Sequence, residues 1–95
     1  MATVNLNWTT KKVTVPADTD LAQYRVAIDG IDVQNVPFGT LTASFLNVAP
    51  GDYIARVALA NKDNSHLDFE ISQAFNVPTP TVELDGADVI SVSLS

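Results

Sequence analysis

The stretch Ser44–Asn64, "SFLNVAPGDYIARVALANKDN", contains the pattern that decides the fold. Between Tyr53 and Leu59, the odd-numbered residues Tyr53, Ala55, Val57 and Leu59 would share one face of a strand, and Ile54, Arg56 and Ala58 the other. This period of two predicts a β-strand with one buried face. The Ala-Pro-Gly-Asp run at 49–52 predicts a turn before this strand, because Pro and Gly favour turn geometry. The polar run Asn61–His66 predicts a loop after it.

The same alternation recurs along the chain, and no stretch has a sustained helical period. Asp29-Gly30 between two isoleucines predicts a type I′ hairpin turn. Short strands separated by turns predict one all-β domain over residues 1–95, an antiparallel immunoglobulin-like β-sandwich of about 7–9 short strands. The other expected strand segments are Ala2–Trp8, Val13–Val15, Tyr24–Ile28, Asp32–Val36, Leu41–Phe45, Leu67–Val77, Val82–Leu84 and Ile90–Leu94.

Residues that share the inward phase of these strands are expected to form the core. Six of the seven aromatic residues fall on that phase, and Phe38 is the exception. The segment Asp88–Leu94 is expected to pair in a sheet, because its alternating apolar residues need a covered face. The expected core residues are Val4, Leu6, Trp8, Tyr24, Val26, Ile28, Phe45, Tyr53, Val57, Phe69 and Ile71.

The quoted stretch resembles the E and F strands of fibronectin type III domains, in which Pro-Gly precedes a Tyr at the start of strand F. "VNLNWT" resembles the strand B of that family with its core Trp, here Trp8, and "QYRVAIDG" resembles its strand C. The resemblance covers residues 2 to about 77. Tyr53 follows Gly51 by two positions where the family usually has three, so the hydrogen bond of its hydroxyl is expected to differ. No strand precedes the Trp strand, and residues 81–94 are expected to occupy that place beside it.

Composition excludes several function classes. Eleven Asp and Glu against five Lys and Arg give a net charge of −6, and Lys11-Lys12 is the only adjacent basic pair, so we expect no nucleic-acid binding. No run approaches the roughly 20 apolar residues of a membrane span. The N-terminus lacks the pattern of a signal peptide, so we expect the protein to stay in the cytoplasm where it is made. The absence of cysteine agrees with a reducing compartment.

Few residues offer chemistry. His66 is the only histidine and there is no cysteine, so a nucleophile–base pair or a zinc site would have to be built from His66 and carboxylates. Catalysis needs an oriented set of groups, so we expect no enzyme activity, no cofactor and no small-molecule ligand. His66 is expected to be a solvated loop residue. Seven aspartates lie in or beside predicted turns, where Asp is an ordinary turn former, and whether they bind calcium stays open.

The expected function therefore follows from exclusion and resemblance. Free-standing domains that resemble fibronectin type III modules occur in bacteriophage virions, which assemble in the host cytoplasm and need no signal peptide. We expect a non-enzymatic virion protein, most concretely a capsid decoration or tail-associated protein, with other virion proteins as its partners. The alternative is a carbohydrate-binding or adhesion module of a bacterial surface protein. The residues expected to contact the partner are Phe38, Asn61, Lys62, Asp63, Asn64 and His66.

Overall fold

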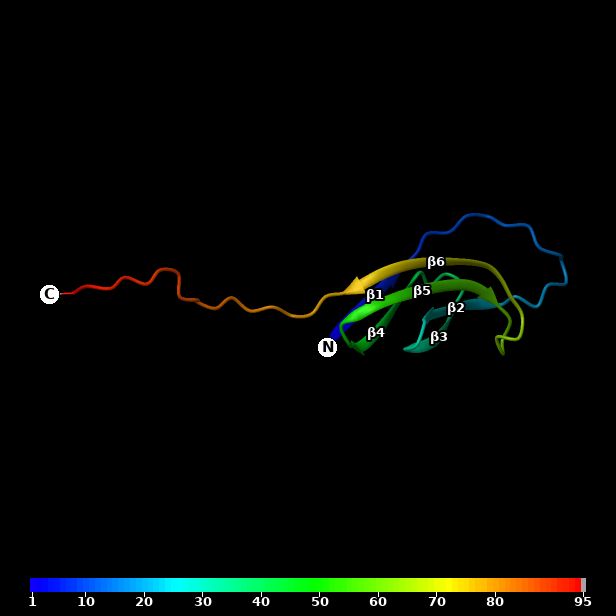
Figure 1. Cartoon of the computed structure of the whole chain (residues 1–95). Coiled ribbons are helices and arrows are strands. Elements are labelled where there is room, and N and C mark those ends of the chain that lie inside the picture. Colours follow the sequence, from blue (N-terminus) through cyan, green and yellow to red (C-terminus); the bar gives the residue numbers. More distant parts are fainter. Residues whose placement is uncertain (95) are drawn as a thin grey trace.

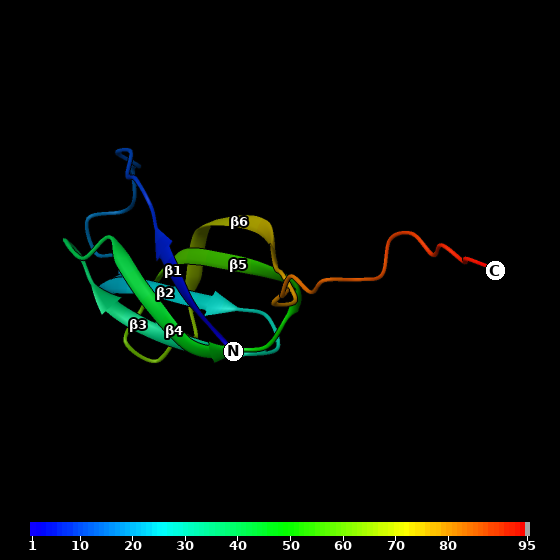
Figure 2. The ribbon, with the colours of Figure 1, turned by 90° about the vertical axis from the view of Figure 1, so that its left-hand side faces the viewer.

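The computed structural model describes residues 1–94 and has six antiparallel strands and no helix in that range. The strands are β1 (Ala2–Asn7), β2 (Gln23–Ile28), β3 (Asp32–Pro37), β4 (Thr42–Val48), β5 (Gly51–Ala60) and β6 (Leu67–Val77). β1 and β4 form one sheet, and the order β3-β2-β5-β6 forms the other (Figures 1 and 2). The all-β prediction is confirmed, with fewer strands than the sequence suggested. The described residues include no helix that could cross a membrane.

One core joins the two sheets. Phe45 and Val48 of β4 and Val26 and Ile28 of β2 are almost fully buried, and Trp8, directly after β1, belongs to the same cluster. The alternation in these strands places every second side chain between the sheets, as the sequence predicts. Among the expected core residues, five are partly buried against this cluster: Val4, Leu6, Tyr24, Tyr53 and Val57.

Two of the expected core residues are exposed. Phe69 is 44% exposed and Ile71 is 59% exposed, so their prediction as core is wrong. The two-stranded sheet is too narrow to cover β6 along its whole length (Figure 2). Phe69 also lies at a register irregularity between β5 and β6 and has a positive φ of 52°, which alternation alone does not predict.

The segments expected as strands at Val13–Val15, Val82–Leu84 and Ile90–Leu94 form none. The C-terminal segment leaves the end of β6 and extends away from both sheets (Figure 1), so the prediction that Asp88–Leu94 pairs within its own chain is wrong. Pro78 and Pro80 contribute to this outcome, because a proline has no N–H with which to continue the β6 ladder and biases the residue before it toward extended backbone. The folded body is therefore residues 2–77.

Two local predictions of turn geometry have different outcomes. Ile31 N–H donates to the Ile28 carbonyl (3.0 Å), so β2 and β3 form the expected hairpin. Only Gly30 has a positive φ there (78°), whereas a type I′ turn requires positive φ at both central residues, so the predicted turn type is wrong. The Tyr53 hydroxyl donates to the Ala49 carbonyl (2.6 Å), which closes the turn between β4 and β5.

We expect Tyr53→Phe to lower the free energy of unfolding by about 1 kcal/mol, the usual net contribution of one partly buried hydrogen bond. Urea denaturation measures the change. Tyr24→Phe is the matched control, since no hydrogen bond from the Tyr24 hydroxyl accompanies its edge-to-face contact with Trp8. Equal stability of Tyr53→Phe and the natural protein would contradict a structural role for this hydrogen bond.

Candidate functional site

The sheet brings the predicted contact residues to one end of the molecule. Gln23, the first residue of β2, pairs with Pro37 of β3 on one side and with Ala60 of β5 on the other. Phe38 and Asn61 come directly after these two partners, so the turn after β3 and the loop after β5 lie on either side of β2. Adjacent strands are about 4.8 Å apart, which places the two segments within about 10 Å. We call Phe38 together with Asn61–His66 the loop end.

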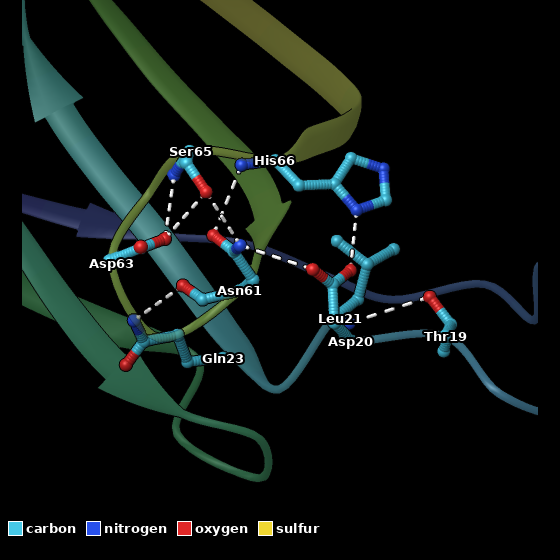
Figure 3. Close-up of polar contacts among 8 residues, drawn as sticks. All are labelled: Thr19, Asp20, Leu21, Gln23, Asn61, Asp63, Ser65 and His66. Carbon is cyan, nitrogen blue, oxygen red and sulfur yellow. Dashed lines mark hydrogen bonds and ion pairs between the residues drawn. The ribbon is translucent and has the colours of Figure 1, made fainter.

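Asn61 organises its loop through both atoms of its side-chain amide (Figure 3). Its Nδ2 donates to Asp20 Oδ2 (3.1 Å) and to Ser65 Oγ (2.9 Å), and its Oδ1 accepts from the His66 N–H (3.1 Å). The Asn61 N–H donates to the His66 carbonyl (3.1 Å), which closes the loop at its base. One side chain thus fixes both ends of a six-residue loop.

Two further contacts hold the loop. Asp63 Oδ1 accepts from the N–H (3.1 Å) and the hydroxyl (2.7 Å) of Ser65. Gln23 Nε2 donates to the Asn61 carbonyl at 3.0 Å, which ties the loop to the first residue of β2. Asn64 takes the left-handed conformation (φ 61°) that Asn tolerates in tight turns. The loop is therefore ordered before any partner binds, which lowers the entropic cost of recognition.

His66 is an exposed loop residue, as the sequence predicts, and it also contacts Asp20. Its Nδ1 lies 2.5 Å from Asp20 Oδ1, and both side chains are about half exposed. This contact, with a smaller contribution from Asn61, lowers the pKa of the Asp20 carboxyl below its ordinary 3.8. The Ser65 hydrogen bonds lower the pKa of the Asp63 carboxyl in the same direction. A carboxylate, a histidine and a serine therefore lie in one loop cluster (Figure 3), but no hydrogen bond joins Ser65 to His66.

The next question is whether the polar cluster could hold a metal ion. Within residues 1–94, no group of three or more His, Cys, Asp or Glu side chains gathers in a way that could hold a metal ion. Lys62, Asp63 and His66 are exposed. The Asp63 carboxylate accepts from Ser65, and the His66 ring contacts Asp20. What the arrangement offers chemically is a set of fixed hydrogen-bond donors and acceptors.

Phe38 adds an apolar element to the loop end. Its ring is 49% exposed, as predicted, and packs edge-on against Tyr24 with 5.1 Å between ring centroids. The turn that carries it is closed by the Thr40 N–H, which donates to the Pro37 carbonyl (3.1 Å). An aromatic ring held by a second ring loses little freedom when a partner covers it.

Sequence reasoning missed Asp20, Gln23 and Ser65 as members of this cluster. Asp20 and His66 are 46 residues apart, and Gln23 and Asn61 are 38 residues apart. The polar character of both loops was visible in the sequence. Their meeting depends on the pairing of β2 with β5, which only the structure supplies.

Acid is expected to loosen the loop. Because the folded-state pKa values of Asp20 and Asp63 are lowered, their contribution to stability is complete above the ordinary value of 3.8 and is lost as the pH falls below it. Carbon-detected NMR titration of the two carboxyl groups should give midpoints below 3.8. His66→Ala should move the Asp20 midpoint upward and leave Asp63, which is held by Ser65, unchanged. An Asp20 midpoint that does not respond to His66→Ala would contradict the contact.

No protein-family model, curated protein or solved structure matches the chain. The fold and the loop end are therefore the observations from which a function is inferred.

Proposed function

We propose that the protein is a non-enzymatic structural or accessory protein of a bacteriophage virion, most concretely a capsid decoration or tail-associated protein. The observation that supports a binding role is the loop end, where exposed Phe38 lies beside a loop fixed by its own hydrogen bonds. Recognition collects on loops that a rigid sheet positions. The partner of such a surface is another virion protein, and assembly takes place in the host cytoplasm.

We also propose that the body is an immunoglobulin-like domain of the fibronectin type III kind. The alternating strand that leads into buried Trp8 supports this proposal. So does the Pro-Gly turn before β5, whose Tyr53 hydroxyl returns to the Ala49 carbonyl. Domains with these features in phage virions are the basis of the virion assignment, since a fold by itself hosts many functions.

The net charge of the protein indicates what kind of surface its partner presents. The net charge of −6 keeps the free protein soluble and favours docking onto a less acidic surface. Asp63 in the loop end and Asp20 beside it add negative charge, and Lys62 is the only Lys or Arg in Asn61–His66.

Mass spectrometry of purified phage particles, from cells that carry the gene, tests the virion assignment. The protein is expected in intact particles in a fixed ratio to a major capsid or tail protein. Its absence from particles, together with binding to a glycan array, would replace the proposal with a carbohydrate-binding module.

Phe38→Ala is expected to weaken binding to particles that lack the protein. An aromatic anchor at an interface contributes about 2 kcal/mol or more, which corresponds to a roughly 30-fold rise in Kd. Leu46→Ala is the matched control, because Leu46 is 68% exposed on β4, outside the loop end. Unchanged affinity of Phe38→Ala, or equal losses in both variants, would exclude the loop end as the contact surface.

A further inference from the structure

An apolar groove remains open between the segment that follows β1 and the inner face of β2, β5 and β6. It has a volume of about 480 Å³ and is lined mainly by apolar surface, with Trp8 and Tyr24 at one side and Leu59, Phe69 and Ile71 along β5 and β6. The 59% exposure of Ile71 marks the part of the four-stranded sheet that the two-stranded sheet leaves uncovered. An exposed apolar groove beside exposed Phe69 and Ile71 is a candidate interaction surface.

The groove lies beside an unpaired strand edge. Among residues 1–94, β1 pairs with β4 only, so its other edge has free backbone donors and acceptors within that range. The segment that continues β1, Trp8–Val13, borders the groove. One added strand beside β1 would satisfy these groups and cover the exposed side chains of β6 with its inward face.

The chain contains a segment with the pattern that such a strand requires. In Asp88–Leu94, the apolar residues Ile90, Val92 and Leu94 alternate with serines, and these three are 87%, 80% and 95% exposed. The segment Asp88–Leu94 has seven residues, which is long enough to pair along the six residues of β1. No part of the described chain covers the side chains of Ile90, Val92 and Leu94, although their alternation with serines is typical of a strand with one buried face.

The geometry favours the groove of another copy over the segment's own groove. The groove lies toward the end of the body where β6 begins, whereas the segment leaves from Val77 at the opposite end and continues outward (Figure 1). A return to its own groove requires the chain to reverse its direction between Val77 and Asp88, and the structure shows no such reversal (Figure 1). The segment instead continues outward, so the molecule is 93 Å long against 22 and 18 Å in the other directions.

Charge agrees with this pairing. The residues after Val77 include Glu83, Asp85 and Asp88 and no Lys or Arg. Lys11 lines the groove and Lys12 follows it. Glu70 also lines the groove, but its carboxylate is paired with Arg56 at 2.9 Å. An approaching acidic segment therefore meets the unpaired charge of Lys11 among the described residues, whereas Val89–Leu94 carries no charge that burial would penalise.

We propose that Asp88–Leu94 of one copy adds as a β-strand to the free edge of β1 in a second copy and fills the groove over Phe69 and Ile71. The copies are thereby linked through strand donation, either as a closed pair or as a longer chain. The inference does not depend on the virion assignment, and its test differs from the particle test, so either can fail alone.

Sedimentation of the full-length protein at increasing concentration tests the association. Species larger than the monomer are expected to grow with concentration. Ile90→Asp with Val92→Asp places two charges on the face that enters the groove and should abolish association while the melting temperature in dilute solution stays unchanged. Ser91→Asp with Ser93→Asp adds the same charge to the other face and should retain association. A natural protein that stays monomeric, or equal behaviour of the two double variants, would overturn the proposal.

Cross-linking decides which copy receives the strand. The protein has no cysteine, so Asn7→Cys on β1 and Ser93→Cys on the C-terminal segment introduce one reactive pair. Equal amounts of isotopically heavy and light double variant are mixed, oxidised and digested. Disulfide-linked peptides that join a heavy and a light half are expected. Only heavy–heavy and light–light peptides would show that the segment folds back on its own chain. The absence of any disulfide between the two introduced thiols would also overturn the proposal.

Discussion

Trp8→Ala is expected to lower the free energy of unfolding by about 3–5 kcal/mol, the usual cost of removing a large buried aromatic ring. The side chain is 9% exposed, contacts Tyr24 edge-to-face at 5.6 Å, and lies in the cluster that joins the two sheets. Because small domains have total stabilities of about 5–15 kcal/mol, the variant should be close to unfolding at room temperature. Circular dichroism during urea titration measures the loss.

The variant Trp8→Phe distinguishes the contribution of the aromatic ring to stability from that of the indole N–H. Trp8 Nε1 is buried and has no hydrogen-bond partner among the described residues. Phe keeps an aromatic ring against Tyr24 and removes this unsatisfied donor, so its destabilisation should be clearly smaller than that of Ala. Equal losses in both variants would mean that the indole of Trp8 makes a contact that this structure does not contain.

Ile28→Ala and Ile71→Ala form the second large contrast. Both residues face the same side of the four-stranded sheet, but Ile28 is 1% exposed and Ile71 is 59% exposed. Ile28→Ala should cost about 2–5 kcal/mol, because it leaves a cavity in the core. Ile71→Ala should change the stability of the dilute monomer by less than about 0.5 kcal/mol, as exposed substitutions usually do.

Chemical denaturation of both variants in dilute solution tests this contrast. Comparable losses would mean that the groove over Ile71 is already covered in the monomer. The same Ile71→Ala variant should weaken association between copies, since Ile71 is then part of the surface that the donated strand covers.

The sequence predicts a strand correctly where a segment of alternating residues has a neighbouring strand to pair with. Tyr24–Ile28 and Tyr53–Leu59 lie within β2 and β5, and their inward residues are buried or half-buried. Alternation records which face of a strand would be apolar. It does not record whether a second sheet exists to cover that face, which is why Phe69 and Ile71 were wrongly assigned to the core.

The C-terminal segment shows the same limit more strongly. Ile90, Val92 and Leu94 have the pattern of a strand, but a strand forms only where another strand supplies hydrogen-bond partners. Within its own chain, this segment lies away from the strands and pairs with none of them (Figure 1). The sequence of Asp88–Leu94 is therefore suited to a strand, but within the described monomer no neighbouring strand pairs with it.

The loop end was partly predictable for a different reason. The polar composition of Asn61–His66 and the flanking Pro and Gly of Phe38 indicate exposed loops. The contact of His66 with Asp20 depends on a pairing between strands distant in sequence, which local patterns do not encode.

Hydrogen-exchange mass spectrometry of the full-length protein in dilute and in concentrated solution tests the central claim, that a folded body of residues 2–77 lacks one strand and receives it from another copy. In dilute solution, peptides from β2 and β5 should be protected and peptides from Asp88–Leu94 should exchange freely. Over a roughly hundredfold rise in concentration, Asp88–Leu94 should gain protection, because association follows mass action. Protection of Asp88–Leu94 that is already present in dilute solution, or that is absent at every concentration, would contradict the account.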